Sequence, residues 1–459
     1  MIDIKGKYTT AKVYTDELEE SASEQIKQMV DSPAFTNQVS IMPDVHAGAG
    51  SVIGFTMPLG DKVIPNIVGV DIGCSVISTE FNHFNFPDLS KLDNIIRSVI
   101  PFGYEVRETL DSTFEFPWSE FRLSVLVLTE RFIEVTDIRP PLTTNYSDLV
   151  NMSYSEYFPR LCKKVGASED RAVKSIGTLG GGNHFIEFGQ SVLSPTQVWL
   201  TIHTGSRQLG LKIANYHQNI AKRSNKKEEI DKIKSEIEEQ IKAISTDDKE
   251  ERVKLVYSLN CEMGKRIKAL SNEKTIPGLE YLEGIDIYNY LVDMLFAQMY
   301  AKLNRATILK TIISEAGPDL GKVVSNIDTV HNYIDFSTPD FMIRKGAVSA
   351  QKDEKFVIPL DMEHGVLICE GKGNKEWNYS APHGAGRRLG RRAAKRTLKL
   401  EDFKERMEKA KVFSNNINME TIDESAEAYK DTDSIIKNIE PTAEILDYII
   451  PFHNMKASG

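Results

Sequence analysis

The chain has 459 residues, of which 41% are hydrophobic and 27% charged, and its formal net charge is −10 at pH 7. This composition is ordinary for a soluble globular protein, and the acidic balance argues against a general nucleic-acid coat, so an RNA partner would need a local basic patch. No apolar run reaches the length of about 18 residues that a transmembrane helix needs. The four cysteines show no paired spacing and the N-terminus has no apolar signal segment, so we expect a reducing, cytoplasmic location.

The first 80 residues predict a short strand, a helix and then several strands. An amphipathic pattern favours a helix from Thr15 to Val30. Residues 39–80 are rich in glycine and β-branched side chains, which is typical of strands joined by tight loops. One such loop carries Asp44 and His46, which are either catalytic groups or turn formers that hydrogen-bond to their own backbone.

A buried strand is predicted around the run Pro65-Asn-Ile-Val-Gly-Val-Asp71-Ile-Gly-Cys74, because the run is apolar and β-branched on both sides of the acid. An ionised carboxylate in such a run needs a partner, since removing it from water costs several kcal/mol. A metal ion is the simplest partner, with Asp71 as a hard ligand and Cys74 as a soft one. The alternative is a turn or capping aspartate beside an inert core cysteine.

The middle of the chain places two histidines next to predicted strands. His184 follows a glycine-rich run and precedes Phe-Ile-Glu187, and His203 follows the apolar run Val198-Trp-Leu-Thr-Ile. We therefore expect the two imidazoles to share one cavity. Residues 211–306 are helical in pattern, and the dense charge run at 221–254 predicts a solvated helical hairpin that projects from the body. An RNA-contacting arm is the alternative, which the mixed charge of this run disfavours.

From residue 307 onward the pattern returns to strands, with His331 at the end of one of them. His383 stands in a glycine-rich loop that leads into a predicted basic helix, Arg388–Arg396. A spacing of four residues puts three cations on one face: Arg387, Arg391 and Lys395. Such a face is either solvated or binds phosphate, and its position directly after His383 favours an anion at the helix N-terminus, with His383 as a candidate nucleophile.

Three histidines complete a possible ligand set with Asp71 and Cys74: His184, His203 and His331. A single histidine at a strand end is usually a structural core residue. Together, the five side chains form an N/O/S set that suits Mn²⁺, Fe²⁺, Co²⁺ or Zn²⁺. Five ligands exceed one tetrahedral site, whereas two ions that share Cys74 would use all of them, and two-metal centres suit phosphoryl chemistry.

In this order the motifs resemble those of the RtcB family of RNA-splicing ligases. The residues that carry the resemblance are Met42-Pro-Asp-Val-His46, Asp71-Ile-Gly-Cys74, Gly181-Gly-Asn-His-Phe-Ile-Glu187, His203-Thr-Gly-Ser-Arg207, His331-Asn332-Tyr, His383-Gly-Ala-Gly-Arg387 and Tyr429-Lys-Asp. The resemblance implies one α+β domain over residues 1–459, with mixed β-sheets around a two-metal cavity and a helical insertion at about 211–306.

The resemblance also implies an RNA ligase that depends on GTP and Mn²⁺ and acts in RNA repair or tRNA splicing. It would join RNA 3′-phosphate or 2′,3′-cyclic phosphate ends to 5′-hydroxyl ends through a His383–GMP intermediate. Asp71, Cys74 and His184 would hold one Mn²⁺, and Cys74, His203 and His331 the other. Asp44 would help to position the 5′-hydroxyl, and Arg207 and Arg387 would contact RNA or nucleotide phosphate. The residues implied around the nucleotide are Asn183, Glu187, Asn332, Asp361, Gly384, Ala385, Gly386 and Lys456.

Departures from the family pattern cluster in one segment. Asp361 and Val366 stand where the family has two serines of the nucleotide pocket, and Gly390-Arg391 replaces a Ser-Arg pair. A divergent nucleotidyltransferase that modifies nucleic-acid ends with another nucleotide is therefore the second hypothesis, and a non-catalytic RNA-binding relative is the third. The expected partners are RNA ends, GTP and an archease-like activator, with no membrane.

Overall fold

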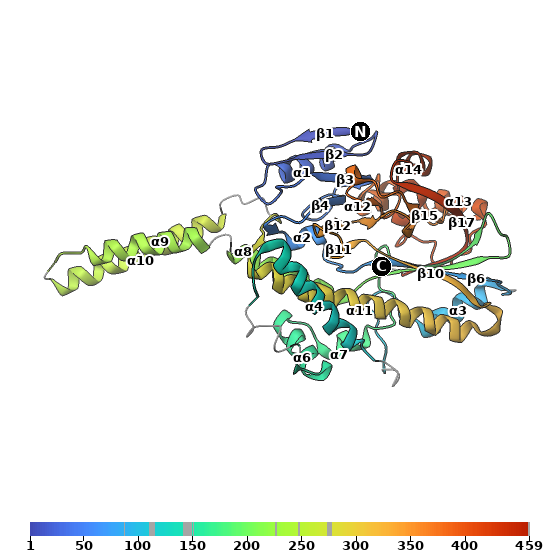
Figure 1. The fold of residues 1–459 in the computed structure, drawn as a ribbon, viewed down its shortest axis with the longest axis horizontal. Coiled ribbons are helices and arrows are strands. Elements are labelled where there is room, and N and C mark those ends of the chain that lie inside the picture. The colour runs from blue at the N-terminus through green and yellow to red at the C-terminus, as the bar shows by residue number, and fades with distance from the viewer. Residues whose placement is uncertain are drawn as a thin grey trace.

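The computed structural model describes residues 1–86, 88–109, 115–140, 149, 151–224, 227–246, 248–272 and 278–457. Two large β-sheets lie beside a layer of helices, and one helical hairpin projects from the body (Figure 1). The predicted α+β fold is confirmed. In the part of the chain that the structure describes, no helix is both long enough and apolar enough to cross a membrane. All four cysteines are free thiols.

The N-terminal sheet has six strands in the order β1-β2-β3-β4-β12-β11. Its strands are β1 (Ile2–Lys5), β2 (Thr10–Val13), β3 (Val39–His46), β4 (Ile53–Pro58), β12 (Met342–Lys345) and β11 (Asn332–Asp335). Helix α1 (Glu20–Val30) packs beside it and begins later than the predicted Thr15. The Thr15 hydroxyl bonds the backbone of Glu17, and this local turn competes with a helical start.

The second sheet has seven strands in the order β10-β6-β8-β7-β17-β15-β14. These strands are β10 (Val323–Val330), β6 (Ser75–Phe81), β8 (Val198–Thr204), β7 (Phe185–Ser191), β17 (Ala443–Lys456), β15 (Val366–Gly371) and β14 (Lys355–Pro359). The two edge strands approach each other, because the Val357 amide of β14 donates to the Thr329 hydroxyl of β10 at 3.1 Å. The sheet therefore curls into a nearly closed barrel.

Helix α11 (Ile285–Ala316) forms the centre of the helical layer and is buried along most of its length. It extends into residues 307–316, where the sequence pattern predicted strands. The helices around it are α3 (Leu89–Val99), α4 (Trp118–Thr136), α6 (Tyr154–Val165), α7 (Glu169–Lys174) and α8 (Arg207–Ser224). Shorter elements complete the fold: β5 (Lys62–Val63), β9 (Leu282–Glu283), β13 (Ala347–Ser349), β16 (Ser380–Pro382), α12 (Arg391–Thr397), α13 (Leu400–Ala410), the 3₁₀ turn η4 (Ile422–Glu424) and α14 (Thr432–Ile439).

The projecting hairpin consists of α9 (Lys227–Lys242) and α10 (Lys249–Asn272), and Figure 1 shows it extending away from the rest of the molecule. Its two helices pack against each other. Ile233 and Ile237 of α9 are buried, and Arg266 forms an ion pair with Glu236 at 2.6 Å. The predicted solvated hairpin is confirmed, and it extends beyond the charge run at 221–254 that indicated it.

The strand predicted through Asp71 is wrong. Residues Pro65–Val68 form a single helical turn, α2, and β6 begins only at Ser75. Proline suits the first helical position, and Gly69 and Gly73 take φ angles of +95° and +70°, which interrupt an extended chain. Asp71 and Cys74 therefore lie in a loop at the end of the barrel.

Candidate active site

Five side chains from four separate segments meet at one end of the barrel. The Cys74 sulfur lies 3.2 Å from His203 Nε2 and 3.6 Å from His184 Nε2. His203 Nε2 is 3.3 Å from His331 Nε2, and His184 Nε2 is 3.0 Å from an Asp71 carboxylate oxygen. The structure thus brings together all five predicted ligands, and Cys74, His184 and His203 form a potential metal-binding group.

Backbone carbonyls set the orientation of two of these imidazoles. His184 Nδ1 lies 2.9 Å from the Leu179 carbonyl, and His203 Nδ1 lies 3.1 Å from the Asn183 carbonyl. A carbonyl can only accept, so each Nδ1 carries a proton. The Nε2 atoms then point into the cluster, that of His203 towards Cys74 and His331 and that of His184 towards Asp71 and Cys74. Proteins commonly orient metal-binding histidines in this way.

The donor set fits a metal ion because its lone pairs converge in a buried space. Burial lowers the pKa of His203 and His331 well below the ordinary histidine value, so both rings are neutral ligands. The two Nε2 atoms face each other at 3.3 Å, and a cation between them would be bound by both once His331 carries its proton on Nδ1. Burial and the nearby Asp71 carboxylate raise the pKa of the Cys74 thiol, and a bound cation would reverse that effect.

Helix α11 supports the loops that carry these ligands. The Asn304 amide accepts from the Gly177 and Thr178 amides at 2.8 and 3.1 Å and donates to the Gly205 carbonyl at 3.2 Å. Arg305 donates to the Gly73 carbonyl at 3.1 Å. Gly73 lies so close to α11 that a Cβ there would be 2.8 Å from the Gln298 backbone, so this position needs glycine for space as well as for its φ angle.

His383 lies beside the ligand cluster, and Asp44 holds it in place. The centre of its ring is 4.9 Å from that of His331. Its Nδ1 is 2.6 Å from a carboxylate oxygen of Asp44, a fully buried residue on β3. Nδ1 therefore donates to the carboxylate, which leaves Nε2 as the ring nitrogen that does not contact Asp44. Asp44 also receives the His383 backbone amide at 3.3 Å, so it acts on His383 from two directions.

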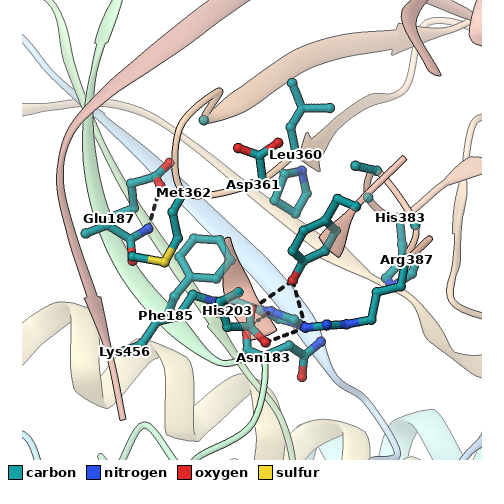
Figure 2. Close-up of a pocket in the computed structure, with 18 of the residues that line it drawn as sticks. Asn183, Phe185, Glu187, His203, Leu360, Asp361, Met362, His383, Arg387 and Lys456 are labelled. Atoms are coloured by element: carbon teal, nitrogen blue, oxygen red, sulfur yellow. Dashed lines mark hydrogen bonds and ion pairs between the residues drawn. The ribbon is translucent and has the colours of Figure 1, made fainter. Parts of the chain in front are cut away.

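A pocket opens next to His383 and contains most of the residues predicted to surround a nucleotide. Figure 2 shows Phe185, Glu187 and Lys456 on one side of this pocket, with His383 and Arg387 on the other. Asn183, Asp361, Gly384, Ala385 and Gly386 also line it. Gly386 has a φ of +74° and packs on the Asp44 backbone, where a Cβ would lie only 2.3 Å from a carbonyl oxygen.

Two carboxylates of the pocket have opposite electrostatic surroundings. Burial raises the pKa of Glu187 to about 8, and the Asn454 amide donates to this side chain at 2.7 Å. For Glu424, burial also acts to raise the pKa, but the cations of Lys456, Arg387 and Arg391 hold it well below the ordinary value. At neutral pH the pocket therefore contains one protonated and one ionised glutamate.

Comparison with known proteins agrees with this arrangement. Residues 25–457 match the family model described as tRNA-splicing ligase RtcB. The chain belongs to the RtcB family. RNA-splicing ligase RtcB of Escherichia coli strain K12 is 27% identical over 453 residues, with 94% of this chain and 92% of that protein covered. The tRNA-splicing ligase RtcB of Aeropyrum pernix is 26% identical over 447 residues (86% and 82% covered), and that of Archaeoglobus fulgidus is 25% identical over 482 residues (91% and 87%).

The basic segment that follows His383 in this RtcB protein is not the free cationic helix that the sequence predicted. Helix α12 begins at Arg391, eight residues after His383, so its N-terminus is not adjacent to the histidine. The acids of η4 pair with all three aligned cations. Arg387 bonds Glu424, Arg391 lies 2.8 Å from Asp423 and 2.7 Å from Glu424, and Lys395 lies 3.5 Å from Asp423.

The two residues that replace the serines of the RtcB pattern have different surroundings. Asp361 lines the pocket, but its carboxylate accepts from the Glu363 and His364 amides at 2.9 and 3.0 Å and lies 2.8 Å from the His364 ring. The carboxylate is thus bonded within its own loop. Val366 is buried in β15 and packs in an apolar cluster with neighbours such as Ile449.

Two predicted contact residues lie outside this pocket. The Arg207 guanidinium donates to the Gly103 carbonyl at 2.8 Å and to the Thr178 hydroxyl at 3.1 Å, so it braces the loop before His184. Asn332 links two loops, since it accepts from the Gly346 amide at 3.0 Å and donates to the Asp71 carbonyl at 3.3 Å. It lines an adjoining cavity together with His383 and Asn183. The assignment of both residues to substrate stays a prediction.

Sequence reasoning missed three residues that organise the site: Glu424, Asn454 and Asn304. Glu424 receives Lys456 at 2.6 Å as well as the arginines. The motif Tyr429-Lys-Asp lies only five residues further on, but the local sequence around Glu424 carries no signal of its own. Its role depends on tertiary contacts with two distant segments.

Proposed function

We propose that this RtcB protein is an RNA ligase that uses GTP and two Mn²⁺ ions. It would join RNA 3′-phosphate ends, or 2′,3′-cyclic phosphate ends after hydrolysis to the 3′-phosphate, to 5′-hydroxyl ends, in RNA repair or tRNA splicing. The observation that carries the proposal is the position of His383. Its Nε2 is the ring nitrogen that does not contact Asp44, and the ring lies between the five-ligand cluster and the pocket.

The ligand cluster accounts for the metals in this proposal. Asp71, Cys74 and His184 would hold one ion, and Cys74, His203 and His331 would hold the other, with Cys74 as the shared thiolate. When bound, the ions would neutralise charge on phosphate oxygens at the reacting centre. The chain's own contribution is to keep His203 and His331 neutral, to orient His184 and His203 through backbone carbonyls, and to hold Asp71 through the Ser206 amide at 3.1 Å.

In the first step, His383 Nε2 attacks the α-phosphorus of GTP. A P–N bond forms, the bond from the α-phosphorus to the bridging oxygen breaks, and pyrophosphate leaves. The positive charge that develops on the imidazole is stabilised by Asp44, which accepts the Nδ1 proton in a charge-assisted hydrogen bond. Gly384, Ala385 and Gly386 allow the backbone to approach the nucleotide closely.

Two further displacements complete the reaction. An oxygen of the RNA 3′-phosphate attacks the phosphorus of His383–GMP, the P–N bond breaks, and the RNA end carries GMP. The 5′-hydroxyl then attacks the 3′-phosphorus, loses its proton, and expels GMP. Asp44 stays as the predicted positioning group for this hydroxyl, and its second carboxylate oxygen has no hydrogen-bond partner in the described structure.

The test is incubation with α-labelled GTP and Mn²⁺, followed by denaturing electrophoresis. We expect an acid-labile covalent label on wild type, none on His383→Ala, and full label on a control such as His83→Ala, whose histidine lies on the surface. The absence of label with every nucleoside triphosphate would overturn the proposal.

The second candidate is a nucleotidyltransferase that uses a different nucleotide, and Asp361 in the pocket is the observation that favours it. The same experiment with labelled ATP, CTP and UTP separates the two. Preferential labelling by GTP supports the ligase, whereas preference for another nucleotide supports the alternative. An archease-like activator and a cytoplasmic location stay predictions, and addition of such a protein to the labelling reaction tests the first of them.

A further inference from the structure

The projecting hairpin carries an unpartnered apolar stripe on α10. Val253 and Tyr257 are 68% and 71% exposed, and Cys261 is exposed as well. These three residues are spaced by four and therefore lie along one face of the helix. The half-buried side chains Val256, Leu259 and Met263 follow a different face, and among the residues that the structure describes the hairpin's own packing leaves the stripe exposed.

Gly264 extends the same stripe, and no contact with the described residues of a single copy requires a glycine at this position. It lies eleven residues, or about three turns, after Val253. A Cβ at this position would meet no atom within 4 Å, and the residue has no positive φ angle that requires glycine. Glycine inside a helix is unfavourable relative to alanine, so a close approach by another backbone at this point would explain its presence.

We propose that α10 pairs with α10 of a second copy of this chain in an antiparallel, two-fold arrangement centred on Tyr257. In this register Val253 faces Cys261 of the second copy, and Glu250 lies next to Lys265 of the second copy. Glu250 and Lys265 lie seven residues before and eight residues after Tyr257, on the same flank of the stripe. The two-fold axis therefore generates two pairs of opposite charge. In a parallel pairing, Glu250 would instead lie beside Glu250 of the second copy and Lys265 beside its Lys265, and such pairs of like charge are unfavourable.

The alternative occupants fit the stripe less well. RNA would need cations along the contact face, whereas the stripe itself is apolar. The site is distant in sequence from the ligand cluster and lies on a projecting element (Figure 1), so the pairing does not depend on the proposed function.

The first experiment is disulfide cross-linking of the full-length protein under mild oxidation. In the proposed register, Val253→Cys brings its thiol next to Cys261 of the second copy, and a covalent dimer should form. In wild type the two Cys261 residues would be offset by eight residues, or about 12 Å along the axis, which is too far for a disulfide. Leu255→Cys is the matched control, because Leu255 is also exposed on α10 but lies off the stripe.

The expected result is a dimer band for Val253→Cys that disappears in Val253→Cys/Cys261→Ala, with little or no dimer for wild type or Leu255→Cys. A band of equal strength for Leu255→Cys, a wild-type band, or no band for Val253→Cys would each overturn the register.

Light scattering across a concentration series provides the second measurement. Wild type should shift from monomer towards dimer as concentration rises, whereas Tyr257→Glu and Gly264→Leu should remain monomeric with unchanged circular dichroism. A wild type that is monomeric at every concentration, or a Gly264→Leu variant that dimerises as wild type does, would overturn the pairing.

Discussion

Single side chains at this site each constrain several neighbours. Cys74 lies between two imidazoles, Asp44 holds His383 through both its ring and its backbone, and Glu424 receives cations from two distant segments. The effect of replacing such a residue should therefore exceed the loss of one contact, because buried polar groups are left without partners.

The shared-ligand role of Cys74 predicts unequal metal loss in two variants. After loading with Mn²⁺ and desalting, Cys74→Ala should retain neither ion, whereas His331→Ala should lose about one of the two. Elemental analysis against protein concentration measures this, with Cys369→Ala as a control because Cys369 is buried in β15, away from the cluster. Equal metal content in wild type and Cys74→Ala would contradict the bridging role.

The raised pKa of Glu187 predicts a specific pH dependence of stability without nucleotide. Because the folded pKa is about 8, the folded protein keeps a proton that the unfolded chain loses above about pH 4.5. This residue's contribution therefore falls as the pH rises from about 4.5 to 8. Glu187→Gln mimics the protonated form, so its melting temperature relative to wild type should increase steadily between pH 5 and 8. A constant difference across that range would contradict a protonated Glu187.

Among the secondary-structure elements, α11 couples the helical layer to the ligand loops through Asn304, Arg305 and the backbone at Gln298. Replacement of Asn304 by leucine would leave the Gly177 and Thr178 amides and the Gly205 carbonyl without their partner in a buried space. Each such group costs about 1–3 kcal/mol, so Asn304→Leu should destabilise the protein by about 3 kcal/mol or more.

Urea denaturation followed by tryptophan fluorescence measures this loss of stability. Thr307→Ala, three residues along the same helix, is the control, because its hydroxyl donates to the Leu303 carbonyl within the helix and does not reach the ligand loops described in the structure. An Asn304→Leu variant as stable as this control would show that the loops do not depend on α11.

Elements that depend on local sequence were predictable, and those that depend on distant contacts were not. The dense run of mixed charges at residues 221–254 indicated the hairpin, because the stability of a solvated helix depends little on contacts with distant parts of the chain. The Asp71 loop was mistaken for a strand, since its composition is apolar and only the turn at Pro65 and the positive φ angles of Gly69 and Gly73 reveal the break. The cations of the 387–395 segment were predicted to be available for phosphate, because nothing near them in sequence shows that Asp423 and Glu424 neutralise them.

On the scale of the whole molecule, the two sheets bring together parts of the chain that are hundreds of residues apart. Asp44 comes from β3 of the first sheet, His203 from β8 of the second, and Lys456 from the last strand. The order of motifs predicted that these residues share one site, and the structure places the ligand cluster, His383 and the pocket side by side. The geometry among them depends on how the nearly closed barrel meets the first sheet, which no single segment encodes.

The most direct test of the central claim is ligation of two RNA strands, one ending in a ³²P-labelled 3′-phosphate and the other beginning with a 5′-hydroxyl. With GTP and Mn²⁺, the account predicts a joined product that carries the label at the junction, resistant to phosphatase and absent with His383→Ala. A joined product that forms without GTP, or complete failure to join these ends while His383 still becomes labelled by GTP, would contradict it.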